Sequence, residues 1–93
     1  MEEGKRAIIT VLGHDRVGII YGISGVLASN NVNILDISQT ILQEFFTMVM
    51  VVDVSESLVE FAQLKEQLDL KGKELGLQVN LQHEDIFKFM HRI

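Results

Sequence analysis

The sequence predicts an α+β fold in which four antiparallel strands form one sheet and two helices cover one face of it. Two observations predict this class. Apolar residues recur with a period of two along four stretches and with a period near 3.6 along two others. These stretches follow one another in the order strand, helix, strand, strand, helix, strand. A further apolar stripe of Ile86, Phe89, Met90 and Ile93 predicts a short C-terminal helix over residues 84–93.

The first strand and helix are predicted around a polar loop. Residues 5–12 (KRAIITVL) are rich in β-branched residues and apolar on both faces, which is typical of a central strand. Residues 13–18 (GHDRVG) interrupt the pattern and are bounded by glycines. A helix is predicted over residues 18–30, and Asn30 and Asn31 are expected to end it. Its expected core face consists of Ile19, Ile20, Ile23, Val26 and Leu27.

The middle of the chain predicts a β-hairpin. Residues 32–42 and 44–54 are two extended runs with only Gln43 between them, and their pairing register stays open. The second run is apolar on both faces, which places it in the centre of the sheet. We expect one of these faces to contribute Phe46, Met48, Met50 and Val52 to the core.

The second helix is predicted from an N-terminal and a C-terminal signal. Ser57 and Glu60 stand three residues apart, as in a capping box, and Gly76 is suited to end a helix. The expected buried stripe is Phe61, Leu64, Leu68 and Leu75. After it, Leu77, Val79 and Leu81 alternate with polar residues and predict a fourth strand with one solvated face. This order of elements is the split βαβ, ferredoxin-like βαββαβ arrangement.

Length and composition limit the classes of protein. With 93 residues the chain is expected to form a single domain, 1–93, whose core spans about 5–83. It contains no Cys, which excludes disulfides, thiolate metal sites and Cys nucleophiles. His83 and His91 are isolated, so we expect no metal and no cofactor. Glu2 and Glu3 stand where a signal peptide needs bases, which favours a cytoplasmic location.

The charge distribution argues against polyanions and membranes as partners. The net charge is −5, and residues 17–64 contain five acids but no Lys or Arg. Such a stretch offers little to a nucleic acid, which binds mainly through its phosphates. The uncharged run 17–35 contains glycines, serines and asparagines, so it does not resemble a membrane span. We expect neither nucleic acid nor membrane binding.

The loop 13–18 is the best candidate site, because the start of a helix offers free N–H groups to an anion. Its two glycines have the spacing of a phosphate-binding loop, but Ile19 and Ile20 follow where that motif needs Lys and Ser or Thr. Gly18, Gly22 and Gly25 do not fit the dinucleotide spacing either. A plain structural turn remains the alternative to a small-ligand site.

These residues resemble a known family. Residues 15–19 (DRVGI), followed by Asn33 and Ile34 fifteen residues after Gly18, resemble the signature of ACT domains, which are small regulatory modules that sense amino acids. The resemblance covers residues 5–83. The segments 37–40 (ISQT), 46–48 (FTM) and 86–93 are similar to small stand-alone ACT proteins of bacteria and archaea. The same branch is similar to the ACT parts of glycine-cleavage repressors and formyltetrahydrofolate deformylases.

The resemblance implies an amino-acid site between two subunits. Asp15 and the Asn33 of a neighbouring subunit would hold the amino and carboxylate groups of the ligand, and backbone N–H groups near Gly18 would assist. In some serine-binding members a His stands two positions before the Asp, whereas here Gly13 occupies that place and His14 adjoins Asp15. The identity of the amino acid therefore stays open. The expected binding set is His14, Asp15, Arg16, Val17, Gly18, Ile19, Asn33 and Ile34.

The first helix also carries a line of small residues. Gly18, Gly22, Gly25 and Ser29 fall at i, i+4, i+7 and i+11 on a face without charge. We expect this face to lie away from the core and to contact another subunit, since small residues permit close approach. A chance run of small surface residues is the alternative.

Three functions follow from these expectations. The first is a non-catalytic sensor that binds an amino acid and acts as a homodimer. The second is an interaction module that pairs with another ACT domain and binds no metabolite. The third, least favoured, is an acylphosphatase-like enzyme, in which Arg16 of the loop and Asn33 of a strand would take part.

Overall fold

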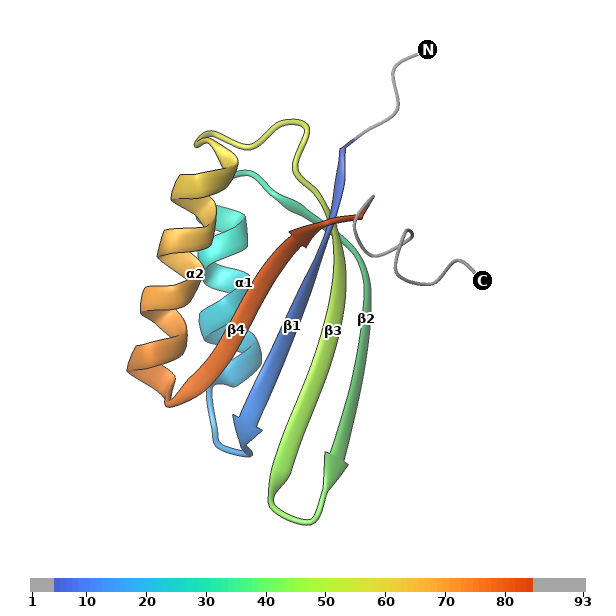
Figure 1. Cartoon of the computed structure of the whole chain (residues 1–93), viewed down its shortest axis with the longest axis vertical. Coiled ribbons are helices and arrows are strands. Elements are labelled where there is room, and N and C mark those ends of the chain that lie inside the picture. Colours follow the sequence, from blue (N-terminus) through green and yellow to red (C-terminus); the bar gives the residue numbers. More distant parts are fainter. Residues whose placement is uncertain (1–4, 85–93) are drawn as a thin grey trace.

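The computed structural model describes residues 5–84 and shows one four-stranded antiparallel sheet with two helices on one face (Figure 1). The strands lie in the order β2-β3-β1-β4. The elements are β1 (Arg6–His14), α1 (Ile19–Ser29), β2 (Asn33–Leu42), β3 (Phe45–Asp53), α2 (Phe61–Leu75) and β4 (Leu77–His83). The predicted ferredoxin-like βαββαβ fold is confirmed. The predicted C-terminal helix 84–93 lies, apart from Glu84, outside the described residues.

The core forms between the sheet and the helices, as the alternating patterns require. β1, β3 and β4 each bury alternate apolar residues against the helices, and α1 and α2 each add one stripe. Ile20 was expected on the core face of α1, but its side chain is 42% exposed. The buried residues of α1 are Ile19, Ile23 and Leu27. The helix thus buries a narrower stripe than the sequence suggested.

The hairpin between β2 and β3 closes through two residues, Gln43 and Glu44. Leu42 pairs directly with Phe45, and Gln43 adopts a left-handed conformation with φ 58°. A bulge at Leu35 shifts the register between Ile34 and Asp36. β3 lies between β2 and β1, as predicted for a central strand, and β2 is left at the edge of the sheet.

The predicted capping box of Ser57 and Glu60 is wrong. The hydroxyl of Ser57 is engaged locally, since it donates to the carbonyl of Val59 (2.8 Å) and accepts from the Val59 N–H (3.2 Å). Glu60 is the N-cap, and its N–H donates to Oε1 of Gln63 at 3.4 Å. The capping box therefore lies one turn further along the chain.

The predicted C-terminal ends of both helices are confirmed in position. Gly76 takes the left-handed conformation (φ 75°) after α2. After α1 it is Asn31 (φ 61°) that turns left-handed, while Asn30 does not. The buried Asn30 instead donates through Nδ2 to the carbonyl of Val26 (2.9 Å) and to Oε1 of Gln67 (2.6 Å), which joins α1 to α2.

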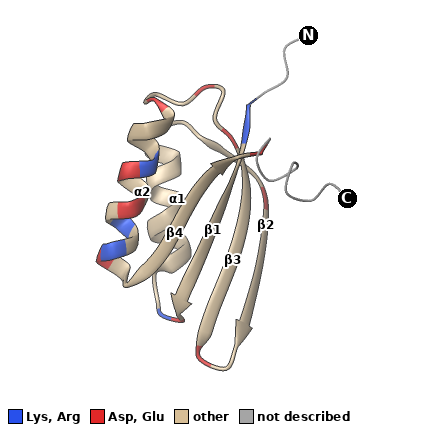
Figure 2. Cartoon of the chain, viewed as in Figure 1, with Lys and Arg blue, Asp and Glu red and all other residues tan. Residues whose placement is uncertain are grey.

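Charge is distributed unevenly over these elements. Most charged residues lie on α2 and in the connections, whereas α1 carries none and the sheet carries few (Figure 2). No helix among the described residues is long and apolar enough to cross a membrane.

Candidate functional site

The loop between β1 and α1 is fixed at both sides by hydrogen bonds to distant parts of the chain. The N–H of Asp15 donates to the carbonyl of Glu44 in the hairpin turn (2.8 Å). Nη1 of Arg16 donates to the carbonyl of Leu75 at the end of α2 (3.1 Å). The loop is therefore held between the hairpin and the C-terminal end of α2, where a guanidinium is electrostatically favoured.

Gly18 sets the start of α1. It is the N-cap with φ 94° and ψ 0°, and its carbonyl accepts the N–H of Gly22 at 2.8 Å. No side chain of the described residues caps this helix start, and the first turn contains no acid. Free backbone donors and the positive helix end therefore face the loop, which suits an anionic group.

A groove of about 290 Å³ lies beside this helix start. Ile19 and Phe46, both buried, belong to its walls, and the carboxylate-bearing Asp15 and the amide-bearing Gln39 add polar groups. This volume is at the lower limit of small-molecule pockets, which usually measure about 300–1,000 Å³. The lining residues are Asp15, Arg16, Gly18, Ile19, Ile20, Tyr21, Gln39, Ile41 and Phe46.

The structure brings only part of the expected site together. Asp15, Arg16, Gly18 and Ile19 line the groove. His14 lies next to it, with its ring 5.1 Å from that of Phe45, whereas the side chain of Val17 is 95% exposed and lines no part of the groove.

Asn33 and Ile34 lie at the opposite end of the sheet. Asn33 pairs with Asp53 of β3, and His14 pairs with Phe45 of the same strand. These partners are eight residues apart, roughly 26 Å at a rise of about 3.3 Å per residue. The groove can therefore meet an Asn33 only from another chain. Ile34 packs against the core, which is a structural role.

Sequence reasoning missed the part of the groove that β2 supplies. Gln39 and Ile41 face the same side of the sheet as the core, because they pair with the buried Met48 and Phe46. A two-residue hairpin loop would have predicted this register, but Gln-Glu is not a typical sequence for such a turn. Tyr21, which is not among the expected binding residues, also lines the groove.

The line of small residues on α1 does not face outward throughout. A Cβ at Gly22 would lie 3.0 Å from Cδ1 of Leu75 and 3.4 Å from Cδ of Lys71, so Gly22 faces α2 of the same chain. The expectation that it lies on a free face is wrong. Gly25 has nothing within 4 Å of the corresponding position, and Ser29 is exposed.

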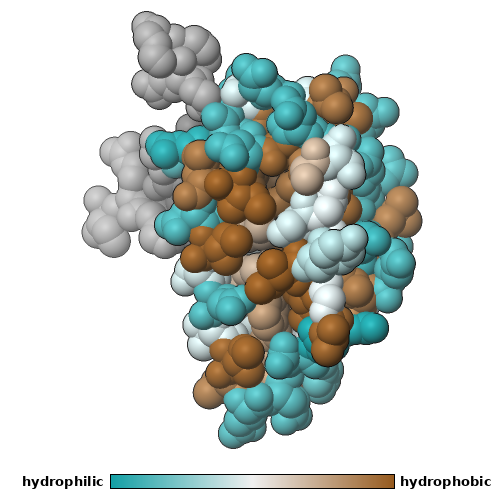
Figure 3. Space-filling view, turned by 180° about the vertical axis from the view of Figure 1, so that it is seen from behind, coloured by the Kyte–Doolittle hydropathy of each residue, from teal (hydrophilic) through white to brown (hydrophobic). Residues whose placement is uncertain are grey.

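Exposed apolar side chains gather on α1 and on the neighbouring edge strand β2. Ile20 and Tyr21 belong to α1, and Leu35, Ile37 and Ile41 belong to β2. Seen from behind, hydrophobic residues extend over the middle of the molecule and are bordered by hydrophilic ones (Figure 3). We call these five side chains the α1–β2 surface. Exposed apolar side chains that are grouped in this way are typical of interaction sites.

Comparison with known proteins assigns the fold to a family. The sequence model of the ACT domain family matches residues 5–82 of this chain. The chain belongs to the ACT domain family. A UPF0237 protein of Methanocaldococcus jannaschii is 60% identical over 89 residues, which cover 96% of this chain and 99% of that protein. The stand-alone ACT branch expected from the sequence is thereby confirmed.

Solved structures agree with this assignment. An ACT domain protein from Streptococcus pneumoniae has 42% sequence identity and a TM-score of 0.79, with 91% of this chain and 96% of that chain covered. A formyltetrahydrofolate deformylase from Pseudomonas syringae shares the ACT fold with a TM-score of 0.80 at 19% identity, over 88% of this chain and 28% of that one. The expected likeness to deformylases therefore holds for the fold.

The described residues contain no group of three or more His, Asp and Glu side chains that could hold a metal ion. The groove instead offers the carboxylate of Asp15, the guanidinium of Arg16, the amide of Gln39 and the backbone donors at the start of α1. These groups can bind a small zwitterion, because a carboxylate attracts an ammonium group and N–H donors attract a carboxylate.

Proposed function

We propose that this ACT protein is a non-catalytic regulatory sensor that binds an amino acid between two copies of the chain. The ACT family supports the regulatory role. The groove at the uncapped start of α1 supports the binding of a ligand. Its position beside the edge strand β2 is the main observation behind a site shared by two chains. Assembly and ligand binding are then coupled, because the site is complete only in the dimer.

The edge strand β2 supports dimer formation. It has ten residues, of which only Asp36 is charged, and its outer edge is unpaired among the described residues. Long uncharged edges tend to pair with another strand. The α1–β2 surface adjoins this edge, so that a second copy would pair along β2 and cover exposed apolar side chains. Nothing lies within 4 Å of the position that a Cβ would take at Gly25 of α1, so this residue leaves room for close contact.

A two-fold symmetric pairing of β2 strands would move the partner's Asn33 towards the groove. A two-fold axis near the middle of β2 would pair two β2 strands antiparallel, which brings the partner's Asn33 to the end of β2 that carries Leu42. Leu42 follows Ile41, which lines the groove. The partner's Asn33 would then lie at the same end of the sheet as the groove, whereas within one chain the two are about 26 Å apart.

The expected chemistry assigns one role to each group. The carboxylate of Asp15 binds the ammonium group of the amino acid. The N–H groups at the start of α1, beginning at Ile19, and the carboxamide of the partner's Asn33 bind its carboxylate. Arg16 positions the loop through its hydrogen bond to Leu75.

Calorimetric titration of the common amino acids tests the proposal. We expect at least one of them to bind and to raise the melting temperature as its concentration rises. Asp15→Asn should weaken this binding about tenfold or more, because the ammonium group loses its charged partner. Glu66→Gln, which removes an exposed carboxylate of α2, is the matched control and should bind as the wild type does. No binding at millimolar concentration contradicts the sensor.

The second candidate is an interaction module that pairs with another ACT domain and binds no metabolite. The exposed α1–β2 surface supports it, because this surface suits a partner whether or not a ligand is present. Light scattering separates the two candidates. A dimer whose association no amino acid strengthens favours the module, whereas strengthened association favours the sensor.

The acylphosphatase-like alternative gains no support from the geometry. Arg16 lies at one end of the sheet and Asn33 at the other, so one chain does not assemble the pair on which that interpretation depends.

A further inference from the structure

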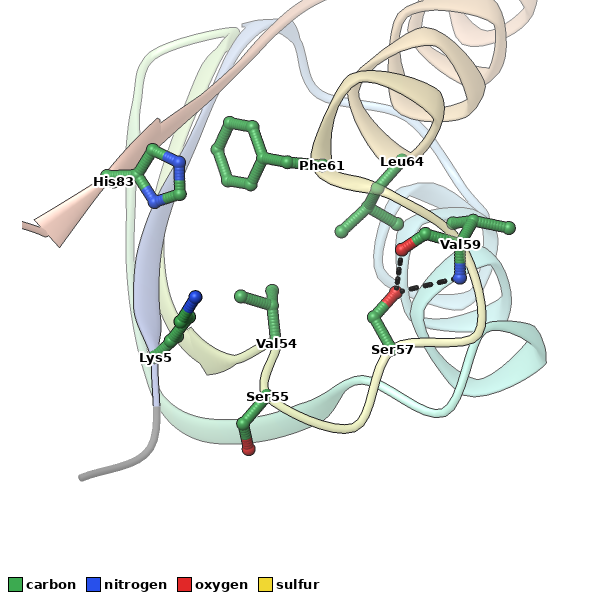
Figure 4. A pocket seen from close by; sticks show the side chains of 8 residues that line it. All are labelled: Lys5, Val54, Ser55, Ser57, Val59, Phe61, Leu64 and His83. Carbon is green, nitrogen blue, oxygen red and sulfur yellow. Dashed lines mark hydrogen bonds between the residues drawn. The ribbon is translucent and has the colours of Figure 1, made fainter. Parts of the chain in front are cut away.

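A second cavity lies at the end of the sheet opposite the groove. Its volume is about 600 Å³, within the usual range of roughly 300–1,000 Å³ for small-molecule sites. The start of β1, the segment that follows β3, the first turn of α2 and the end of β4 surround it (Figure 4). No residue of this cavity belongs to the groove.

Backbone hydrogen bonds hold the walls of the cavity in place. The N–H of Val54 donates to the carbonyl of Lys5 (2.8 Å), and the N–H of Ser57 donates to the carbonyl of Val54 (3.1 Å). The N–H of Leu58 donates to the carbonyl of Asn30 (2.9 Å), which connects this segment to the end of α1. The cavity is therefore built into the fold.

The two serines in the lining are already engaged. Ser55 directs its N–H and its hydroxyl to Oδ1 of Asp53, at 2.9 and 2.7 Å, and these hydrogen bonds lower the pKa of the Asp53 carboxyl. The hydroxyl of Ser57 is bound to Val59. Neither serine is therefore the principal polar group offered to a ligand.

Two nitrogen-bearing side chains face the cavity instead. Figure 4 shows the amino group of Lys5 and the ring of His83 directed into it from the same side. Neither forms a hydrogen bond or an ion pair with a side chain of residues 5–84. His83 is stacked on Phe61, with ring centroids 3.8 Å apart and planes inclined by 14°, which fixes the orientation of the imidazole.

The rest of the lining is apolar. Val54, Phe61 and Leu64 line the cavity beside the two nitrogen-bearing groups (Figure 4). The capping box of Glu60 and Gln63 engages the start of α2, so an anion in the cavity would depend on side chains rather than on free helix donors. The cavity thus combines one polar, basic corner with an apolar body.

We propose that this cavity binds a small amphipathic carboxylate. Its oxygens contact the Lys5 ammonium group and an N–H of His83, because charge-assisted hydrogen bonds to a carboxylate are the strong ones. Its apolar body packs against Phe61, Leu64 and Val54. The ligand needs no amino group, since no carboxylate lines the cavity among the described residues. This inference does not depend on the amino-acid site in the groove.

A titration of the full chain with 3-phenylpropionate, followed by amide chemical shifts in two-dimensional NMR, tests the inference. We expect saturable shifts centred on Lys5, Phe61, Leu64 and His83. The alcohol 3-phenylpropan-1-ol has the same apolar body without the carboxylate and should bind at least about tenfold more weakly. Equal affinity of acid and alcohol, or shifts centred on residues 13–18, overturns the proposal.

Substitution of the lysine gives the matched comparison. Lys5→Met keeps the length and removes the charge, and it should weaken binding of the acid about tenfold while leaving the alcohol unchanged. Lys65→Met removes an exposed charge of α2 that does not line the cavity and should bind the acid as the wild type does. The dispersion of the NMR spectrum verifies that each variant is folded. An equal loss in both variants, or no loss in Lys5→Met, contradicts the proposed role of Lys5.

Discussion

At the scale of single residues, Gly18 before α1 and Gly25 within it have opposite backbone requirements. Gly18 precedes the helix with φ 94°, a conformation that residues with a Cβ rarely adopt. Gly25 lies inside the helix with ordinary dihedral angles, and a Cβ there meets nothing within 4 Å. The same substitution should therefore have opposite effects on the free energy of unfolding at the two positions.

We predict that Gly18→Ala lowers the free energy of unfolding by about 1–2 kcal/mol, the usual cost of the left-handed region for an L-residue. Gly25→Ala should raise it by up to about 1 kcal/mol, since alanine is the better helix former. Urea unfolding at one fixed protein concentration measures both. A loss of stability in Gly25→Ala would instead indicate that a subunit contact at this position requires glycine.

The core could be predicted residue by residue, but the edges of each buried stripe could not. Periodicity identified Ile19, Ile23 and Leu27, because the buried face of an amphipathic helix follows the 3.6-residue spacing of its apolar residues. Ile20 was expected in the core but is exposed, and Gly22 was expected on a free face but faces α2. A helical wheel does not show on which side of α1 the second helix packs. That direction depends on how α1 and α2 lie together on the sheet.

At the scale of elements, β2 is the strand through which we propose that two copies of the chain assemble. Its inner edge pairs with β3, whereas no described strand pairs with its outer edge. Ile37 lies in the middle of β2 with 40% of its surface exposed, and it pairs with the buried Met50 of β3. A charge at this position would remain solvated in one chain but would be desolvated in a dimer that pairs through β2.

If the chain forms the proposed dimer through β2, Ile37→Lys should convert it into a monomer, as measured by light scattering at micromolar concentration. The matched control is Leu70→Lys, which places the same charge at an apolar side chain of α2 that is 59% exposed. The control should remain dimeric, because Leu70 lies outside the α1–β2 surface. Two variants that both dissociate, or both stay dimeric, would place the interface elsewhere.

The hairpin shows that strands can be predicted from the sequence without their pairing register. The two strands and the central place of the second one followed from the apolar patterns, and the structure confirms them. The register did not follow, because it depends on the left-handed Gln43 and on the bulge at Leu35, two positions without a typical sequence signal. Gln39 and Ile41 of the groove were missed for the same reason.

At the scale of the whole molecule, the two ends of the sheet carry different groups. One end holds the groove with Asp15 and the start of α1, and the other holds Asn33 and the second cavity. The family motif joined Asp15 and Asn33 in one site although a single chain keeps them about 26 Å apart. The sequence thus indicated the residues of the candidate site, whereas their separation in space shows that any common site needs two chains.

The dependence of the site on two chains leads to a prediction about concentration. If the amino acid binds only where Asp15 meets the partner's Asn33, its apparent affinity should increase as the protein concentration rises through the dissociation constant of the dimer. Ile37→Lys should lose amino-acid binding although it leaves every group of the groove in place. Calorimetric titration at several protein concentrations, for the wild type and for Ile37→Lys, measures both effects. A monomeric Ile37→Lys variant that binds the amino acid with unchanged affinity would show that one chain forms the site, because only a site confined to one chain is independent of assembly.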